Sequence, residues 1–361
     1  MALTIVRDDI TKINVDAIVN STNEYFEVGG LGVDAGIHYA AGPELKKALA
    51  AIGCCPAGSA VITEAFNITS CRYIIHTVGP VYVDGKHGEK ALLKSCYRNI
   101  LALAKEKNCR SVAIPLISTG AYRYPKAEAY SIATACIREF LISLPDDEDM
   151  MVYIVLYDRE SVAVSEKIDA GVKHFISEAY RRNKRERLYQ SFFKDGLPYG
   201  RSEAKPQAPE PLFSASFEDA MPTCASFEAG RTEAAVPSPL PGEGYENEDR
   251  SFADMCEWWC QQKGISKNEF YNRANINKSM FWGMKHHPEQ IPKKTNALAC
   301  VIGLKLNYDQ ALDLLSRAGM TLSKYYETDL IVEYFIREKN YNIDEINALL
   351  YKKDLALLGT Y

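Results

Sequence analysis

A short stretch near the N-terminus restricts the fold of this chain more than any other. An apolar run, Ala17–Val19, has the length and character of a buried strand, and the polar residues Asn20–Asn23 follow it directly. Three glycines come next, at Gly29, Gly30 and Gly32. An amphipathic segment, Val33–Ala41, then has helical spacing. The order of strand, glycine-rich loop and helix predicts unpaired backbone N–H groups at a helix N-terminus, where a phosphate group can bind.

The glycine-rich loop differs from the two commonest phosphate-binding motifs. It contains neither the G-x-G-x-x-G pattern of dinucleotide-binding folds nor the Gly-Lys-Ser/Thr ending of a P-loop. Glycine at these positions lets the backbone approach a phosphate closely, because no Cβ intervenes. Taken alone, such a loop is equally compatible with a tight turn.

Strand-like and helix-like segments alternate over residues 1–180. Apolar runs typical of strands occur at 3–7, 60–63, 73–78, 111–117 and 151–157. Helical patterns occur at 43–52, 89–107, 125–144 and 161–180. This alternation predicts an α/β layered domain with a largely parallel sheet, in which ligands bind beyond the carboxyl ends of the strands. A second small-residue loop, Ser118–Tyr122, follows a strand and is expected to meet the glycine-rich loop at that edge.

Length and composition limit the remaining classes of protein. The chain has 361 residues, which predicts about two domains and connecting material. A formal net charge of -5 gives no overall bias toward nucleic acid. The first residues of the chain do not have the pattern of a signal peptide, and no apolar run is long enough to span a membrane. We therefore expect a cytoplasmic protein with reduced thiols and without a membrane partner. Cys256, Cys260, His286 and His287 fit no zinc module, and we predict no metal or cofactor.

The composition changes after residue 180. A basic run at 181–187 is followed by sequence rich in Pro, Gly, Ser, Ala and Glu, and residues 181–250 are predicted to be a disordered linker. Residues 251–361 have helical patterning throughout, with short turns. We therefore predict three parts: an α/β domain at 1–180, the linker at 181–250 and a separate all-α domain at 251–361.

The first part resembles the macrodomain family, which binds ADP-ribose. Several separated motifs carry the resemblance, in order Asp9–Thr11, Val19–Asn23, Gly32–Asp34 with Ile37 and His38, His76–Pro80, Ile117–Tyr122, and Tyr124 with Pro125. The resemblance implies a three-layer α/β/α fold with a mixed, mostly parallel sheet. It also implies that Asp9 accepts the adenine amino group, with Ile10 nearby, and that the two loops wrap the diphosphate. The other ligand-binding positions that it implies are Asn20, Gly29, Gly30, Gly32, Val33, Ser118, Thr119, Gly120, Ala121 and Tyr122.

Within that family the pattern around Asp34 is similar to the hydrolysing branch. Those members remove mono-ADP-ribose from acidic side chains and deacetylate O-acetyl-ADP-ribose. The resemblance implies that Asp34 orients or activates the attacking water and that Asn23 places the distal ribose. Two departures bear on catalysis: the insert Glu24–Val28 is one residue longer than expected, and Leu31 replaces a common glycine. The zinc-dependent branch is disfavoured, because its Cys and His ligands are absent around Asp34.

Each of these residues also has a purely structural interpretation. Asp34 is a suitable N-cap for the helix it begins. Asn20 could satisfy loop backbone, and Tyr122 could be an ordinary core aromatic. For His38 and His76 we favour packing or hydrogen bonding over catalysis.

The C-terminal part resembles a divergent phage-repressor-like helix-turn-helix domain. Gly264–Ser266, Phe270–Asn277 and the helix at 278–285 carry this resemblance, which implies that the last helix enters a major groove. That helix is unusually apolar for a DNA reader, so a protein-docking or dimerising module is favoured over DNA binding. Three functions remain open: an ADP-ribosyl hydrolase with a tethered helical adaptor, an ADP-ribose reader without catalysis, and a DNA-associated regulator that senses an ADP-ribosyl metabolite.

Overall fold

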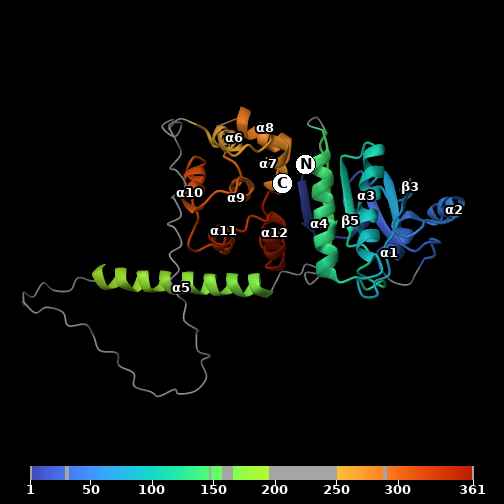
Figure 1. Cartoon of the computed structure of the whole chain (residues 1–361), viewed down its shortest axis with the longest axis horizontal. Coiled ribbons are helices and arrows are strands. Elements are labelled where there is room, and N and C mark those ends of the chain that lie inside the picture. The colour runs from blue at the N-terminus through green and yellow to red at the C-terminus, as the bar shows by residue number, and fades with distance from the viewer. Residues whose placement is uncertain are drawn as a thin grey trace, which may run out of the picture. The chain divides into compact units, whose positions relative to one another are not determined.

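The computed structural model describes residues 2–28, 32–145, 148–156, 166–194, 250–287 and 291–359 (Figure 1). Met1–Asn183 and Arg250–Tyr361 together form one compact unit, and Lys184–Asp249 form a second. The α/β domain and the C-terminal helices therefore belong to the same unit. Most of the predicted linker, residues 195–249, lies outside the described residues.

A six-stranded sheet forms the centre of the α/β domain. Its strands are β1 (Ala2–Val6), β2 (Ala17–Thr22), β3 (Ala60–Glu64), β4 (Tyr73–Val78), β5 (Ser111–Pro115) and β6 (Met151–Val155). The strand order is β1-β6-β5-β2-β4-β3, and every neighbouring pair is parallel except β3 and β4. The prediction of a mixed, mostly parallel sheet is confirmed.

Helices cover both faces of the sheet, and successive strand residues point to opposite faces. On β2, Ala17 and Val19 belong to the core formed with α3 and α4, whereas Ile18 belongs to the core formed with α1 and α2. The helices are α1 (Val33–Ala41), α2 (Pro43–Ile52), α3 (Glu89–Glu106) and α4 (Lys126–Ser143). Strands covered on both sides need apolar residues at nearly every position, which explains their continuous apolar runs. The three-layer α/β/α fold is confirmed.

The chain reverses its direction across the sheet between β2 and β5. From β2 it proceeds to β3 and β4 on one side, and from β5 it proceeds to β6 on the other. Such a reversal opens a crevice beyond the carboxyl ends of the two neighbouring strands. The loops after β2 and β5 both begin at this crevice.

Helix α5 (Glu166–Lys194) is longer than the predicted 161–180 and continues through the basic run. Phe175 and Asn183 of this helix pack against the C-terminal region. The Phe175 ring lies edge-on to Tyr334, with centroids 5.8 Å apart, and Asn183 Nδ2 donates to the Lys324 carbonyl at 2.7 Å. The last helix of the α/β sequence pattern therefore connects the domain to the helical region.

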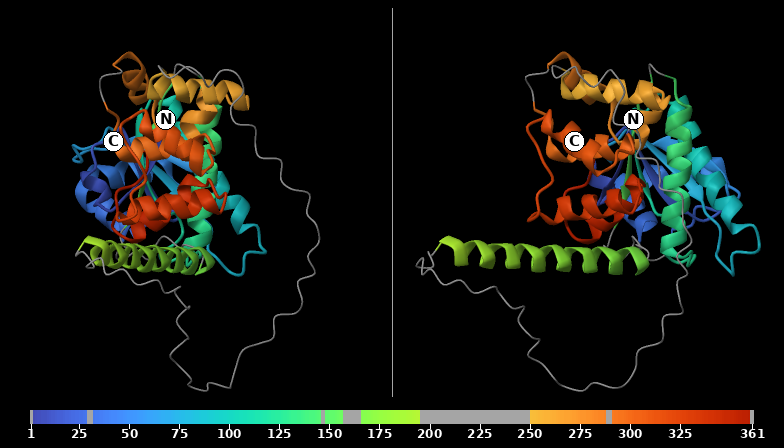
Figure 2. Two further views of the ribbon diagram at one scale, coloured as in Figure 1. Left: turned by 90° about the vertical axis from the view of Figure 1, so that its left-hand side faces the viewer. Right: turned by 60° about the vertical axis from the view of Figure 1, so that its left-hand side comes forward.

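The C-terminal region is all-α, as predicted (Figure 2). Its helices are α6 (Phe252–Lys263), α7 (Lys267–Arg273), α8 (Lys278–His286), α9 (Lys294–Gly303), α10 (Tyr308–Ser316), α11 (Glu327–Arg337) and α12 (Ile343–Lys352). Several begin at a side chain that accepts a backbone N–H of the first turn: Ser251, Ser266, Asn277, Asn307 and Asn342. Such caps satisfy N–H groups that have no partner within the helix. They explain why the starts of these helices can be predicted from the sequence.

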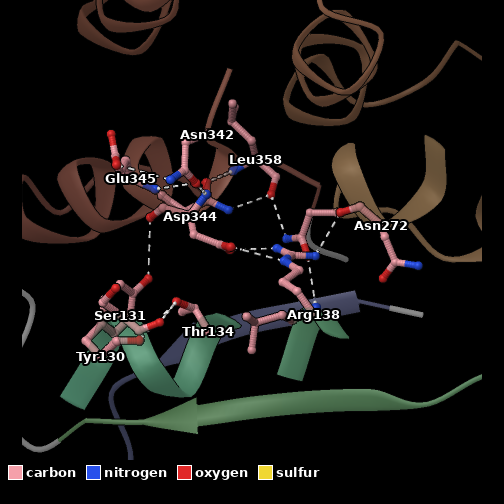
Figure 3. Close-up of polar contacts among 12 residues, drawn as sticks. Tyr130, Ser131, Thr134, Arg138, Asn272, Asn342, Asp344, Glu345 and Leu358 are labelled. Carbon is pink, nitrogen blue, oxygen red and sulfur yellow. Dashed lines mark hydrogen bonds and ion pairs between the residues drawn. The ribbon is translucent and has the colours of Figure 1, made fainter. Parts of the chain in front are cut away.

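The helical region contacts the α/β domain through a bidentate ion pair (Figure 3). Arg138 of α4 donates from Nη2 and Nε to the two Asp344 oxygens, at 2.7 and 3.1 Å, and from Nη1 to the Asn272 carbonyl at 2.9 Å. The Arg138 and Asp344 side chains are only 12% and 19% exposed. Nearby, the Tyr130 hydroxyl donates to the Asp344 carbonyl at 3.4 Å. A planar guanidinium matches a carboxylate in this two-point geometry, so the contact is specific in orientation.

The same region covers edge strand β1. The backbone N–H of Leu3 donates to Asn275 Oδ1 at 2.9 Å, and Ala348 of α12 joins the core that includes Leu3. An uncovered edge strand presents unpaired N–H groups that other chains can pair with. The helical region therefore completes the β1 edge of the sheet. Among the described residues, no helix is both long and apolar enough to cross a membrane.

Candidate functional site

A cavity of about 470 Å³ lies at the carboxyl edge of the sheet, between the ends of β2, β5 and β6. Its walls come from the two loops that the sequence predicted to meet and from the start of α1. The lining residues that the sequence predicts as site residues are Asn23, Gly32, Val33, Asp34, Ser118, Thr119, Gly120, Ala121 and Tyr122. Gly29 and Gly30 lie outside the described residues. The volume suits a ligand of nucleotide size.

Asp34 stands in the first turn of α1 and on the cavity wall. The N-cap of α1 is Gly32, so Asp34 is not the capping residue. Its Oδ1 accepts from Asn20 Nδ2 at 2.7 Å and lies 3.6 Å from His38 Nε2. Its side chain is 13% exposed, so the carboxylate is held from behind while part of it reaches the cavity. A carboxylate held in this way is suited to orienting a water molecule or a sugar hydroxyl.

Asn23 lines the cavity but uses its side chain to shape its own loop. Its Nδ2 donates to the Glu27 carbonyl at 2.5 Å, and its Oδ1 accepts from the backbone N–H groups of Tyr25 and Glu27 at 3.2 and 3.0 Å. The inserted segment Glu24–Val28 is thus folded around the Asn23 amide. The sequence left open that the Asn20 side chain satisfies loop backbone groups. In the structure, the side chain that bonds the loop backbone is that of Asn23.

The loop after β5 closes the opposite wall. Ser118 has a backbone φ of 65°, which is unusual for a residue with a side chain and is often found at functional sites. A Cβ on Gly79 would lie 2.0 Å from Ser118 Oγ, so glycine at 79 permits this close approach. Among the described residues, Ser118 Oγ and Thr22 Oγ1 are buried without a hydrogen-bond partner, and both residues line the cavity. Because a buried hydroxyl without a partner is costly, these two are suited to bonding a ligand.

Tyr122 ends the same loop and is half-buried on the cavity wall. Its pKa is raised by partial burial and by the negative charges of Glu24 and Asp34. The phenol therefore keeps its proton at neutral pH. Its hydroxyl is therefore available as a hydrogen-bond donor to a ligand.

Three predicted ligand residues are not part of the cavity wall. Asp9 caps a short 3-10 helix, η1 (Ile10–Lys12), by accepting from the Thr11 backbone N–H and hydroxyl at 3.0 and 2.7 Å. The hydrogen bond from the Thr11 side chain contributes most to holding the Asp9 pKa below its usual value. Ile10 is buried in the core with α1 and α2. Asn20 is fully buried behind Asp34.

Several residues of the wall were not predicted from the sequence. They are Ser21, Thr22, Pro115, Leu116, Lys126, Val155 and Leu156. Val155 ends β6 and Leu156 follows it, so the rule that ligands bind beyond parallel strand ends could have identified both. Lys126 directly follows the Tyr124–Pro125 motif and begins α4, so it adds a positive charge beside a helix N-terminus.

The cavity therefore combines an anion-binding environment with fixed polar groups and an apolar wall. The N-terminus of α1, the neighbouring N–H groups of the Ser118–Tyr122 loop and Lys126 favour negative charge. Asp34, Thr22 and Ser118 can bond sugar hydroxyls. Among the described residues, no group of three or more His, Cys, Asp or Glu side chains is arranged to hold a metal ion.

The model of the Macro domain family matches residues 19–133 of this chain. A macro domain-containing protein of Chlorobaculum tepidum is 44% identical over 166 residues, which cover 46% of this chain and 95% of that protein. This chain belongs to the macro domain family. The macro domain comprises the sheet and the cavity just described, and the comparison with C. tepidum leaves more than half of the chain unmatched.

Two further comparisons include a named enzyme and a solved structure. The O-acetyl-ADP-ribose deacetylase of Salmonella newport is 46% identical over 165 residues, which cover 44% of this chain and 89% of that enzyme. The macrodomain of Oceanobacillus iheyensis, solved with ADP, is 41% identical, with a TM-score of 0.41, and covers 44% of this chain and 85% of that chain.

Proposed function

We propose that this chain hydrolyses ADP-ribosyl esters, removing mono-ADP-ribose from modified acidic side chains and deacetylating O-acetyl-ADP-ribose. The observation that carries the proposal is the Asp34 carboxylate, held by Asn20 and open to a cavity that favours anions. The similarity to an O-acetyl-ADP-ribose deacetylase over 89% of that enzyme's length supports the same chemistry. The diphosphate would lie against the helix N-terminus and the Ser118–Tyr122 loop, with the distal ribose toward Asp34.

The reaction adds one water molecule across one ester bond. In O-acetyl-ADP-ribose the water oxygen bonds to the acyl carbon, the acyl–oxygen bond breaks, and a proton goes to the ribose oxygen. In a modified carboxylate side chain, the corresponding products are ADP-ribose and the free side-chain acid. Asp34 would orient the water and take up its proton as the oxygen attacks.

Release of ADP-ribose from a mono-ADP-ribosylated, acidic-linked protein tests the proposal. The unaltered chain is compared with Asp34→Ala and Asn23→Ala, and free ADP-ribose is titrated into each preparation. We expect the unaltered chain to release ADP-ribose. Asp34→Ala should reduce kcat by about 100-fold or more, in the range lost with a general base, while the Kd for ADP-ribose changes little.

Asn23→Ala has a different expected effect. Its amide organises the insert, so its loss should disturb the loop and weaken both binding and turnover. Retention of full kcat by Asp34→Ala would exclude the proposed role of Asp34. Binding without release from any ADP-ribosyl linkage would exclude the hydrolase.

The alternative, a reader that binds ADP-ribose without cleaving it, has one observation in its favour. The Asn23 amide, which the family resemblance assigns to the distal ribose, is already engaged by the backbone of its own loop. An engaged amide has less capacity to place the ribose for attack. Tight ADP-ribose binding by both the unaltered chain and Asp34→Ala, with no product from either, would establish the reader.

For the helical region we infer a protein-contacting role rather than DNA reading. Lys278, which begins the helix proposed to enter a major groove, donates to the Pro145 and Glu148 carbonyls of the macro domain at 3.2 and 3.1 Å. On the same helix Trp282 is 57% exposed and stacks on His286. An adaptor that swings on the linker would have to break the contacts of Lys278 and Arg138. A salt-dependent shift of duplex DNA by the full chain would instead support the DNA-associated regulator.

A further inference from the structure

The fully buried His76 of β4 lies two hydrogen bonds from Asp34. Asn20 Nδ2 donates to Asp34 Oδ1 at 2.7 Å and lies 3.3 Å from His76 Nδ1. His76 Nε2 lies 3.0 Å from Thr63 Oγ1 on the neighbouring strand β3. The cavity wall does not include Asn20, His76 or Thr63. These three side chains form a line behind the carboxylate and do not face a ligand.

The direction of each hydrogen bond follows from the charge of Asp34. A carboxylate accepts and cannot donate, so the Asn20 amide must turn its NH₂ group toward Asp34. The same NH₂ group then faces His76 Nδ1, which must accept. A neutral imidazole that accepts at Nδ1 carries its proton on Nε2 and donates it to Thr63 Oγ1. Thr63 Oγ1 in turn donates to the Glu64 carbonyl at 3.1 Å.

Burial keeps His76 in this state. The side chain has no exposed surface, and burial, followed by the charge on His38, lowers the pKa of His76 to about 3. The imidazole is therefore neutral at every pH at which the chain would work. The Nδ1 atom remains an acceptor throughout, and the hydrogen-bond directions do not change.

We propose that His76 is a positioning residue that fixes the Asn20 amide, and through it the Asp34 carboxylate, for attack on the substrate. This inference rests on the proposed hydrolase function and extends its site to residues that touch no ligand. The Asn20 NH₂ group lies within hydrogen-bond distance of two acceptors, Asp34 Oδ1 and His76 Nδ1, whereas Asn20 Oδ1 is buried without a partner among the described residues, so these two contacts hold the amide in place. Without the His76 acceptor, the amide and the carboxylate gain freedom, and misplacement by about 1 Å can cost about 100-fold in rate.

Two substitutions separate positioning from simple filling of space. In His76→Asn the amide oxygen lies near the place of Nδ1, so the acceptor for Asn20 is kept and the contact with Thr63 is lost. In His76→Gln the longer side chain reaches Thr63 and the acceptor for Asn20 is lost. Both leave space where the ring was, and Gln fills more of it. A role in packing alone would make His76→Gln the better variant.

The experiment measures kcat and KM for hydrolysis of O-acetyl-ADP-ribose, the Kd for ADP-ribose, and the thermal midpoint of the full chain. We expect kcat to fall about threefold or less in His76→Asn and about tenfold or more in His76→Gln, as for lost supporting hydrogen bonds in metal sites. The Kd should stay near that of the unaltered chain in both. Thr134→Val is a control for Thr63→Val, since Thr134 Oγ1 donates to the backbone of its own helix. Of these two, only Thr63→Val should lower kcat, because the His76 ring then has no acceptor that keeps its proton on Nε2 and Nδ1 free to accept from Asn20.

The outcomes distinguish this inference from the function on which it rests. Equal kcat in the two His76 variants, or a higher kcat in His76→Gln, would overturn the positioning role while leaving the hydrolase intact. An unaltered chain that binds ADP-ribose and releases no product would overturn the hydrolase and this inference together. A ¹⁵N spectrum of the unliganded chain that shows the His76 proton on Nδ1 would overturn the inference alone.

Discussion

At the scale of single residues, the site depends on groups whose hydrogen-bond partners are fixed by burial. Asp34 is recognisable in the sequence because its chemistry and spacing fit a family pattern. The roles of Asn20 and Asn23 cannot be distinguished from the sequence, since both amides stand in one short polar run. Only the fold shows that Asn20 points into the molecule and that Asn23 is used by its own loop. Local sequence cannot assign side-chain direction at the end of a strand.

Glu89 gives a pH-dependent prediction at the residue scale. Hydrogen bonds from its own backbone N–H and from those of Val83, His87 and Asp84 lower the pKa of Glu89 to about 2. Because this pKa lies below its ordinary 4.5, ionised Glu89 stabilises the fold above about pH 4.5. That contribution is lost as the pH falls toward 2.

Thermal unfolding of Glu89→Gln checks this account. We expect a lower midpoint than for the unaltered chain at pH 7, and a smaller difference as the pH falls below 4.5. Glu139→Gln is the matched control, because Glu139 is exposed and forms an exposed ion pair with Arg98. A difference at pH 7 no larger than that of the control would contradict the loop-holding role of Glu89.

At the scale of elements, most strands and helices follow from periodicity. β4 spans 73–78 and α2 spans 43–52, as predicted: an apolar run ended by Gly79 and Pro80 defines β4, and Pro43 and Gly53 mark the two ends of α2. The predicted end of α5 near residue 180 was wrong, since the helix extends to Lys194; its predicted start at residue 161 lies outside the described residues. Its buried face packs against α11, a partner far away in the sequence that no local pattern indicates.

The turn after β4 yields a prediction for ligand binding. Gly79→Ala places a Cβ 2.0 Å from Ser118 Oγ and 2.6 Å from Ile117 Cγ2, so the Ser118–Tyr122 loop must shift. We expect ADP-ribose binding to weaken by about tenfold, which corresponds to about 1.4 kcal/mol of overpacking strain. Isothermal titration measures the Kd.

Gly36→Ala is the control for this substitution. Gly36 lies within α1, and a Cβ there meets nothing within 4 Å. Alanine favours a helix, so this variant should bind ADP-ribose normally and unfold at the same or a higher temperature. Equal binding by both variants would show that the Ser118 loop is not positioned by its contact with Gly79.

At the scale of the whole molecule, the helical region is part of the same compact unit as the macro domain. Arg138 and Asp344 are 206 positions apart, and nothing in their local sequence indicates that they form an ion pair. The two regions can therefore be predicted from the sequence, but their contact cannot. The two regions are also joined by the backbone N–H of Leu3, on edge strand β1, which donates to Asn275 in the turn between α7 and α8.

Breaking the ion pair should destabilise the chain and loosen the contact. Asp344→Ala leaves the Arg138 guanidinium partly buried without its main acceptor. We expect a loss of about 1–3 kcal/mol, between the values for exposed and fully buried pairs. Denaturant unfolding of Asp344→Ala, Arg138→Met and the double variant measures the coupling. Additive single losses, with no coupling energy, would show that the pair does not hold the two regions together.

The central claim is that the macro domain cavity hydrolyses an ADP-ribosyl ester through Asp34. Hydrolysis of O-acetyl-ADP-ribose by the full chain tests it most directly, because the substrate is a defined small molecule and both products can be quantified. We predict equal amounts of ADP-ribose and acetate from the unaltered chain, and a kcat at least about 100-fold lower for Asp34→Asn with the Kd for ADP-ribose preserved. Unchanged product formation by Asp34→Asn, or binding without any product from the unaltered chain, would contradict the claim.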